Sequence, residues 1–268
     1  MKEIIKVNEK ALSSFSKTLA LSNKMLASAD HHPAEWFDTP EKRLEWWLDL
    51  EPQWKKAFSQ AVFFENKKGE IKKFLPTDSQ LVYLFELKTL LVCGSGNFKN
   101  RNNSANINFQ LTNLNGVENL TNLTRIECDF NGLIESLEPV RHLKKLETLW
   151  ADNNNVTDLS PLTELFNLRG LCVWNNQISS LAPLATMYQL TDLTLGLNGD
   201  GNPLASLKGL EEMVNLRRLY IENCGISSLE PLRNCAKLIS LIAQQNPIES
   251  LEPIKGLKSL YRIRTDIS

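Results

Sequence analysis

Apolar residues recur along the second half of the chain with a period of about 22 residues. The repeated unit opens at Leu123, Leu146, Leu168, Leu190, Leu216, Leu238 and Leu260. All steps are 22 or 23 residues except the step of 26 between Leu190 and Leu216. Self-similarity at a fixed period of this length predicts a solenoid of stacked units, because one such unit cannot bury its apolar face alone.

Each unit follows the pattern L-x-x-L-x-L-x-x-N-x-I-x-x-L-x-P-L-x-x-L. The L-x-L part alternates, as expected of a strand with one buried face. Eight residues after the opening leucines stand Asn131, Asn154, Asn176, Asn198, Cys224 and Asn246. We expect these asparagine amides to turn inward and to bond backbone groups where the strand bends away.

The return half of each unit has a proline at one fixed position. The residues there are Pro139, Pro161, Pro183, Pro231 and Pro253, with Gly209 in the remaining unit. Proline suits the first turn of a short helical segment, where its missing N–H is not needed. Few residues remain for the return path, so the spacing predicts 3-10 or irregular turns rather than α-helices.

The phrase S-L-x-P-L resembles that of the short leucine-rich repeats of the internalin and phosphatase-regulatory-subunit types. It stands here at residues 180–184 and 228–232. The resemblance covers about residues 80–268. It implies an α/β leucine-rich-repeat solenoid with a curved parallel sheet on its concave face, and a role in binding another protein.

Residues 1–75 do not repeat, so we divide the chain into an N-terminal helical cap region (1–75) and a repeat domain (76–268). We expect one helix over about 3–28 and another that begins at Asp38 or Thr39, with Pro40 in its first turn. Thr77 and Gln80 form a capping box for the segment that enters the repeats. The N-terminal region is rich in aromatic residues, which favours a cap over the open end of the solenoid. An independent second binding module is the alternative.

The formal net charge of −1 gives no bulk attraction to nucleic acid or to an anionic membrane. Five cysteines without a C-x-x-C pair suggest neither a disulfide framework nor a zinc knuckle. No signal peptide and no apolar run long enough to span a membrane appear, which favours a cytoplasmic protein. A secreted protein whose export segment has been removed is the alternative.

No pattern of catalytic, cofactor or metal chemistry emerges. His31 and His32 have no third ligand beside them, and H-E-x-x-H is absent. The segment 198–203 has one carboxylate and too little else for a calcium loop. We expect Cys128, Cys224 and Cys235 to lie in the core, without a neighbouring base. The chain is therefore predicted to be no enzyme and to need no cofactor.

The repeat frame assigns outward positions on the concave sheet. The candidates for partner binding there are Glu127, Asp129, Phe130, Trp150, Asp152, Trp174, Tyr220, Glu222 and Ile242. Three aromatic residues open on one sheet would be typical anchors of a protein interface. The surrounding acidic residues favour a partner with a basic patch and disfavour single-stranded nucleic acid. The alternative is that neighbouring side chains or a cap helix pack over the aromatic residues.

Three functions remain open. The first is an adaptor or regulatory subunit that binds a partner protein, and the second is a secreted or surface adhesin-like protein. The third is an enzyme that uses the N-terminal helices. The sequence predicts no oligomeric state.

Overall fold

A computed structural model describes residues 37–63, 74–94 and 109–267. The chain divides into two compact units, Met1–Asp38 and Thr39–Ser268. The helix expected over about 3–28 and the histidine pair lie outside the described residues. Within the described part of the chain, no helix is both long enough and apolar enough to cross a membrane.

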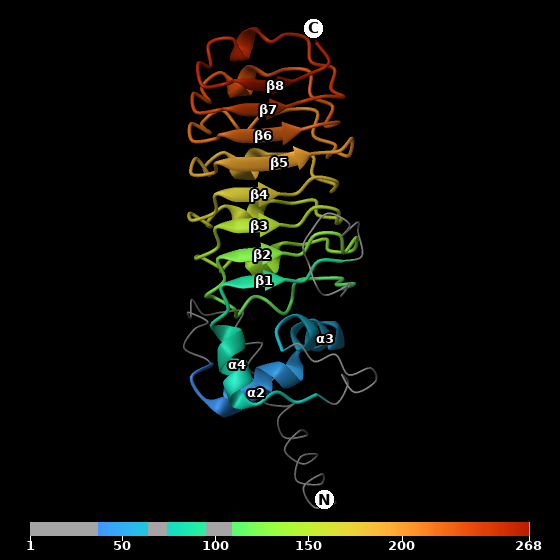
Figure 1. The fold of residues 1–268 in the computed structure, drawn as a ribbon, viewed down its shortest axis with the longest axis vertical. Helices are drawn as coiled ribbons and strands as arrows, with labels where there is room; N and C mark the ends of the chain where they lie inside the picture. Colours follow the sequence, from blue (N-terminus) through green and yellow to red (C-terminus); the bar gives the residue numbers. More distant parts are fainter. Residues whose placement is uncertain (1–36, 64–73, 95–108, 268) are drawn as a thin grey trace, which may run out of the picture. The chain divides into compact units, whose positions relative to one another are not determined.

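Eight parallel strands form one curved, open sheet in which each strand pairs with the next in the chain (Figure 1). The strands are β1 Thr89–Leu91, β2 Arg125–Glu127, β3 Thr148–Trp150, β4 Gly170–Cys172, β5 Asp192–Gly196, β6 Arg218–Ile221, β7 Ser240–Ile242 and β8 Arg262–Arg264. The residue in the second position of each strand from β1 to β7 is buried, while its neighbours on most strands are partly exposed. The predicted alternation is confirmed.

Short 3-10 turns return the chain behind the sheet, as the proline positions predict. They are η4 Glu138–Val140, η5 Ser160–Leu162, η6 Ala182–Leu184, η7 Glu230–Leu232 and η8 Glu252–Ile254. Each has its proline in the first turn, where the missing N–H leaves no bond unmade. The leucines between sheet and turns form the core.

The inward asparagines hold the bends after the strands. Asn176, for example, donates from Nδ2 to the carbonyls of Ala151 and Val173, both at 3.0 Å, and accepts from the Val156 N–H at 2.9 Å. Asn131 and Asn246 are buried and bonded to backbone in the same way, and the buried Asn154 donates from Nδ2 to the carbonyls of Cys128 and Ala151. Cys224 takes the asparagine position once, with Sγ 3.5 Å from the Leu195 carbonyl.

The assignment of Asn198 to this series is wrong. Asn198 is exposed and left-handed, with φ at 57°. Leu197 and Asp200 exchange backbone bonds, so residues 197–200 form a tight turn that projects from the stack. Asn202 is the buried residue, donating to Val173 and Leu195 and accepting from Ile178. The four extra residues of the long unit precede the inward position and displace it.

Three described helices precede the sheet: α2 Pro40–Asp49, α3 Pro52–Ala61 and α4 Asp78–Phe85. Thr39 caps α2 by accepting from the Lys42 N–H, and Thr77 with Gln80 forms the expected capping box on α4. Aromatic rings pack between these helices, with Trp46 4.8 Å from Phe85. Helices α2 and α3 belong to the same compact unit as the repeats, and the division at 75/76 remains a sequence-based prediction.

Helix α3 packs on the first unit of the repeat array. Trp54 is fully buried, and its Nε1 donates to Asn113 Oδ1 at 3.3 Å. Its ring lies against Gly116, where an added Cβ would come within 2.4 Å of the indole. Gly116 occupies the place that proline takes in later units, because the tryptophan ring leaves no room for a side chain.

Glu118 lies at this junction, and one of its carboxylate oxygens is buried without a hydrogen-bond partner. Burial, and to a smaller extent the nearby Glu51 carboxylate, raises the pKa of Glu118 to about 7. The fold therefore favours the protonated form, and the stability this gives is lost as pH rises from about 4.5 to 7.

Glu118→Gln should remove this pH dependence. From pH 5 to pH 8, the free energy of unfolding of the variant should rise on the order of 2 kcal/mol relative to that of the wild type. The reason is that one pKa unit corresponds to about 1.4 kcal/mol. Urea unfolding of both proteins at the two pH values measures the difference. Parallel pH profiles for the two would show that Glu118 titrates normally.

Candidate functional site

A groove of about 940 Å³ crosses the concave side of the sheet from β3 to β6. The first and third residues of these strands face it, because the second points into the core. Its lining residues include Phe130, Thr148, Trp150, Asp152, Gly170, Cys172, Trp174, Asp192, Thr194, Asp200, Arg218 and Tyr220.

The groove results from a contrast in side-chain size along one row of the sheet. Trp150, Cys172, Thr194 and Tyr220 occupy equivalent positions on β3, β4, β5 and β6. With strands about 4.8 Å apart, the two large rings stand roughly 14 Å from each other. The smaller side chains between them form the floor. Gly196, two residues after Thr194 on β5, is buried.

The expectation that Trp174 lies open on the sheet is wrong. Although it lines the groove, Trp174 is only 8% exposed. Phe130 adopts a left-handed backbone conformation, and its ring meets Trp174 edge-on with centroids 6.1 Å apart. Trp150 and Tyr220 remain partly exposed. These two rings are therefore the accessible aromatic walls.

Three other predicted outward residues are also buried. Asp152 accepts from Asn153 Nδ2 at 2.9 Å and from Cys172 Sγ at 3.3 Å, which holds its carboxylate against the sheet. Asp129 is 1% exposed and lies beside Cys93. Ile242 is 4% exposed, because large side chains stand next to it on both neighbouring strands.

Seven of the nine predicted residues line two hollows on the concave side. Phe130, Trp150, Asp152, Trp174 and Tyr220 line the groove. Tyr220 also lines a second hollow of about 410 Å³ over β6 to β8, together with Glu222 and Ile242. Glu127 and Asp129 line neither.

Glu127 forms an ion pair with Arg125 at 2.6 Å, and the Arg125 guanidinium stacks 4.5 Å from the centre of the Trp150 ring. This stack fixes one wall of the groove, since a cation over an indole face is attractive. The sequence-based assignment of outward positions left out the first residue of each strand. Three groove-lining residues stand at that position: Thr148, Asp192 and Arg218. Strand alternation alone would have placed these residues on the same face as Trp150.

One group of potential metal ligands occurs among the described residues: Cys93, Glu127 and Asp129, whose ligand atoms lie within 4.8 Å of one another. Burial and the Asp129 carboxylate raise the pKa of the Cys93 thiol well above its usual range. A metal would have to displace that proton and compete with Arg125 for Glu127.

The remaining buried thiols are held in the protonated form near neutral pH. Burial raises the pKa of Cys128 well above its ordinary value and that of Cys224 and Cys235 to about 11. A nucleophilic cysteine needs the opposite shift. The three thiols therefore serve the core, as their repeat positions predict.

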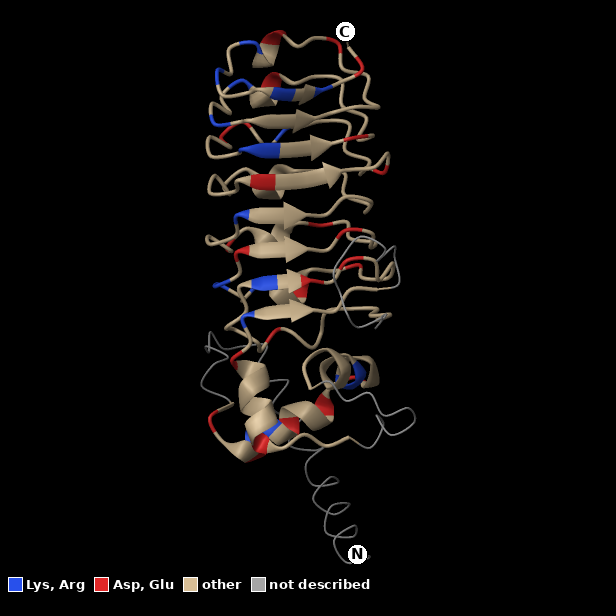
Figure 2. Ribbon diagram, viewed as in Figure 1, with Lys and Arg blue, Asp and Glu red and all other residues tan. Residues whose placement is uncertain are grey.

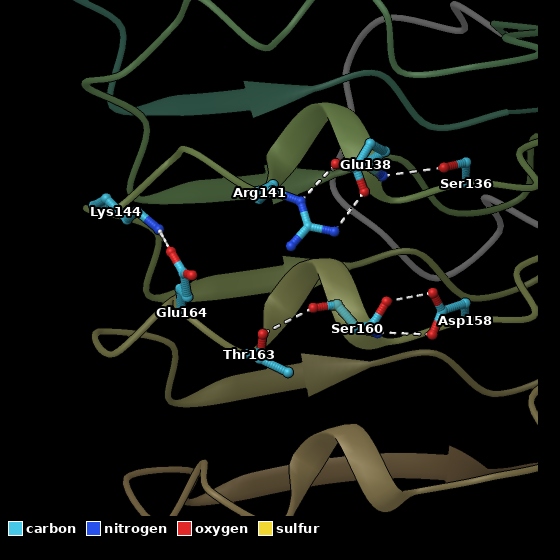
Figure 3. Close-up of polar contacts among 8 residues, drawn as sticks. All are labelled: Ser136, Glu138, Arg141, Lys144, Asp158, Ser160, Thr163 and Glu164. Atoms are coloured by element: carbon cyan, nitrogen blue, oxygen red, sulfur yellow. Dashed lines mark hydrogen bonds and ion pairs between the residues drawn. The ribbon is translucent and has the colours of Figure 1, made fainter. Parts of the chain in front are cut away.

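On the return side, charged residues neutralise each other locally (Figure 3). Glu138 receives two bonds from the Arg141 guanidinium, and Lys144 pairs with Glu164 at 2.8 Å. Asp158 accepts from the N–H and hydroxyl of Ser160. Because these charged residues are already paired with one another, the return side is a poorer binding surface for a partner than the hollowed concave side.

A family model described as leucine-rich repeats (2 copies) matches residues 214–256. Among solved structures, an internalin (inlF) from Listeria monocytogenes is 25% identical, with a TM-score of 0.63 over 80% of this chain and 55% of that one. The fold is a leucine-rich-repeat solenoid. This chain thus spans about half the length of inlF. No curated protein matches the sequence.

Two further structures show the same solenoid fold. Internalin C2 (inlC2) from Listeria monocytogenes is 24% identical, with a TM-score of 0.61 over 80% of this chain and 93% of that one. The leucine-rich-repeat protein LIC12759 from Leptospira interrogans is 22% identical, with a TM-score of 0.57 over 73% and 54%. The expected resemblance to internalins is confirmed at the level of the fold, and that to phosphatase regulatory subunits stays a prediction.

Proposed function

We propose that this solenoid is a cytoplasmic adaptor or regulatory subunit that binds another protein in the concave groove. The observation that carries the proposal is the groove itself, a hollow of about 940 Å³ between Trp150 and Tyr220. Solenoids of this kind present extended concave surfaces to their partners. Aromatic walls around a floor of small side chains suit the insertion of a partner side chain.

The charge of the groove suggests what enters it. The exposed carboxylate of Asp200 lines it, whereas the Asp152 carboxylate is buried and Asp192 is paired with Arg218. The second hollow adds Glu222 beside the shared Tyr220. A lysine or arginine side chain of the partner could therefore lie between the rings and gain a cation–π contact in addition to an ion pair. The groove is not proposed to bind nucleic acid, a membrane or a cofactor.

Capture of partners from the native host tests this proposal. Wild-type protein should retain a specific partner that the Trp150→Ala and Tyr220→Ala variants bind at least about 30-fold more weakly, since truncating a central aromatic anchor commonly costs 2 kcal/mol or more. Lys144→Ala, which removes a charge on the return side, is the matched control. Trp174→Ala is unsuitable, because loss of a buried ring would also destabilise the fold.

Thermal unfolding of each variant separates loss of binding from loss of structure. Folded Trp150→Ala and Tyr220→Ala proteins that retain the partner as the wild type does would refute the concave-groove proposal.

A secreted or surface adhesin-like role is the second candidate, favoured by the likeness to the internalin inlF. The concave groove would then meet a protein outside the cell. Protease treatment of intact source cells distinguishes the two, since only a surface protein would be digested while a cytoplasmic marker persists.

A further inference from the structure

A row of apolar side chains stands exposed in the middle of the array, on the loops that lead into the strands. Phe166, Tyr188 and Val214 are 65%, 59% and 43% exposed. Each stands two residues before the leucine that opens the next unit, so the three follow one another on consecutive units. Lys144 and Ala236 hold the same position before and after them. We call the three apolar residues the entry stripe.

Side-chain amides hold the loops of the entry stripe in register. Asn215 donates from Nδ2 to the Tyr188 carbonyl at 2.9 Å, and Gln189 donates from Nε2 to the Leu165 carbonyl at 3.2 Å. Each bond ties one loop to the loop of the preceding unit. The stripe therefore keeps the spacing of the stacked units, and a partner would not have to order the backbone on binding.

The spacing of the entry stripe suits an α-helix better than an extended strand. Stacked units repeat about every 4.8 Å along the sheet. A helix advances about 5.4 Å per turn, so its residues i, i+4 and i+7 can contact three consecutive units. Side chains on one face of a strand recur only about every 6.6 Å. A helix that lies along the stack thus stays in step with the three apolar side chains.

Exposed basic residues border the stripe on the side of the sheet. Arg169 and Arg217 directly precede β4 and β6, where Figure 2 shows basic residues at the entry to the strands. Neither arginine forms an ion pair with a described carboxylate. On the side of the 3-10 turns, Lys144 neutralises Glu164, and Glu212 is exposed. The two arginines favour acidic side chains on a partner.

We propose that the entry stripe binds an amphipathic α-helix of a partner protein whose apolar face is bordered by acidic residues. The helix lies along the stack on the units from Phe166 to Val214, with its acidic side chains beside Arg169 and Arg217. It ends short of Glu147, which stands at the position of Arg169 one unit earlier. No residue of the stripe lines the concave groove, so this surface is separate from the groove and its partner.

The test is a fluorescence anisotropy titration of the full chain with a labelled helical peptide of about 18 residues. The peptide carries leucine at the i, i+4 and i+7 positions and glutamate at the borders of the leucine face. Saturable binding is expected, and a peptide of the same composition in scrambled order should bind at least about tenfold more weakly. Phe166→Ala with Tyr188→Ala should weaken binding by about tenfold or more. Arg169→Glu with Arg217→Glu should weaken it similarly.

Leu133→Ala and Trp150→Ala are the matched controls. Leu133 is 56% exposed on the loop after β2, and Trp150 lines the concave groove. Both variants should bind the peptide as the wild type does. Thermal unfolding checks the structure of every variant. Because Arg169 and Arg217 are exposed, their replacement tests the proposal even where the double aromatic variant fails to fold.

Three outcomes would overturn the proposal. One is no saturable binding with the chain at about millimolar concentration. Another is equal binding of the helical and scrambled peptides, or binding that neither double variant weakens. The third is dimerisation of the wild type, seen by sedimentation, that Phe166→Ala with Tyr188→Ala abolishes, because a second copy would then occupy the stripe. A second copy fits less well, since stable dimers commonly bury roughly 800 Å² of each partner and three side chains offer much less.

Discussion

Trp54→Ala is expected to lower the free energy of unfolding by about 3–5 kcal/mol, the range for truncation of a large buried aromatic residue. The Trp54 ring is fully buried where α3 meets the first unit of the array, and its centroid lies 5.1 Å from that of the tilted Phe58 ring. Its removal leaves a cavity at Gly116, which has no side chain to fill it. It also leaves the Asn113 amide oxygen without the indole donor. The end of the solenoid that α3 covers would then be poorly packed.

Denaturant unfolding followed by circular dichroism measures this loss. Phe166→Ala is the matched control, because that aromatic side chain is 65% exposed and its removal should change stability by less than about 0.5 kcal/mol. A loss below about 1 kcal/mol for Trp54→Ala would contradict the account of α3 as part of the solenoid core. Two separate transitions in the wild type would show that the helices unfold independently of the repeats.

Asn202→Ala is expected to cost about 3 kcal/mol, whereas Asn198→Gly should be nearly neutral. The Asn202 amide makes three bonds of 2.7–3.0 Å with backbone groups of the core. Without the side chain those buried groups lose a partner, at about 1–3 kcal/mol for each one left unsatisfied. Asn198 is exposed with φ at 57°, a conformation that glycine adopts without strain.

Denaturant midpoints of the two variants decide which asparagine holds the bend of the long unit. A large loss for Asn198→Gly together with a small one for Asn202→Ala would restore the register obtained by counting eight residues from Leu190. Equal small losses would mean that water replaces the side chain at both places.

The repeat itself was predictable because its residues have one role in every unit. Leucines at fixed spacing, a proline at the 3-10 turn and an asparagine at the bend each act within one unit or between neighbours. Asn176 could therefore be placed without knowledge of the fold. The repeat spacing also indicated that Asn202, rather than Asn198, is the inward residue of the long unit. The step of 26 residues exceeds the usual 22 by four, which is the separation of Asn198 from Asn202.

Features that depend on contacts between units could not be obtained from the repeat frame. Trp174 is buried because Phe130, two strands away, turns its ring through a left-handed backbone. Gly116 replaces proline because Trp54, far away in sequence, fills the space. The repeat pattern predicts which way each side chain points, but it does not predict which neighbouring side chain covers it.

Hydroxyl-radical footprinting of the chain with and without its captured partner tests the concave-groove proposal most directly. Trp150 and Tyr220 should lose reactivity in the complex, because the partner would cover the two walls of the groove. Phe166 and Tyr188, which are 65% and 59% exposed outside the groove, should react equally in both states. Protection of Phe166 and Tyr188 with no change at Trp150 and Tyr220 would show that the partner binds elsewhere.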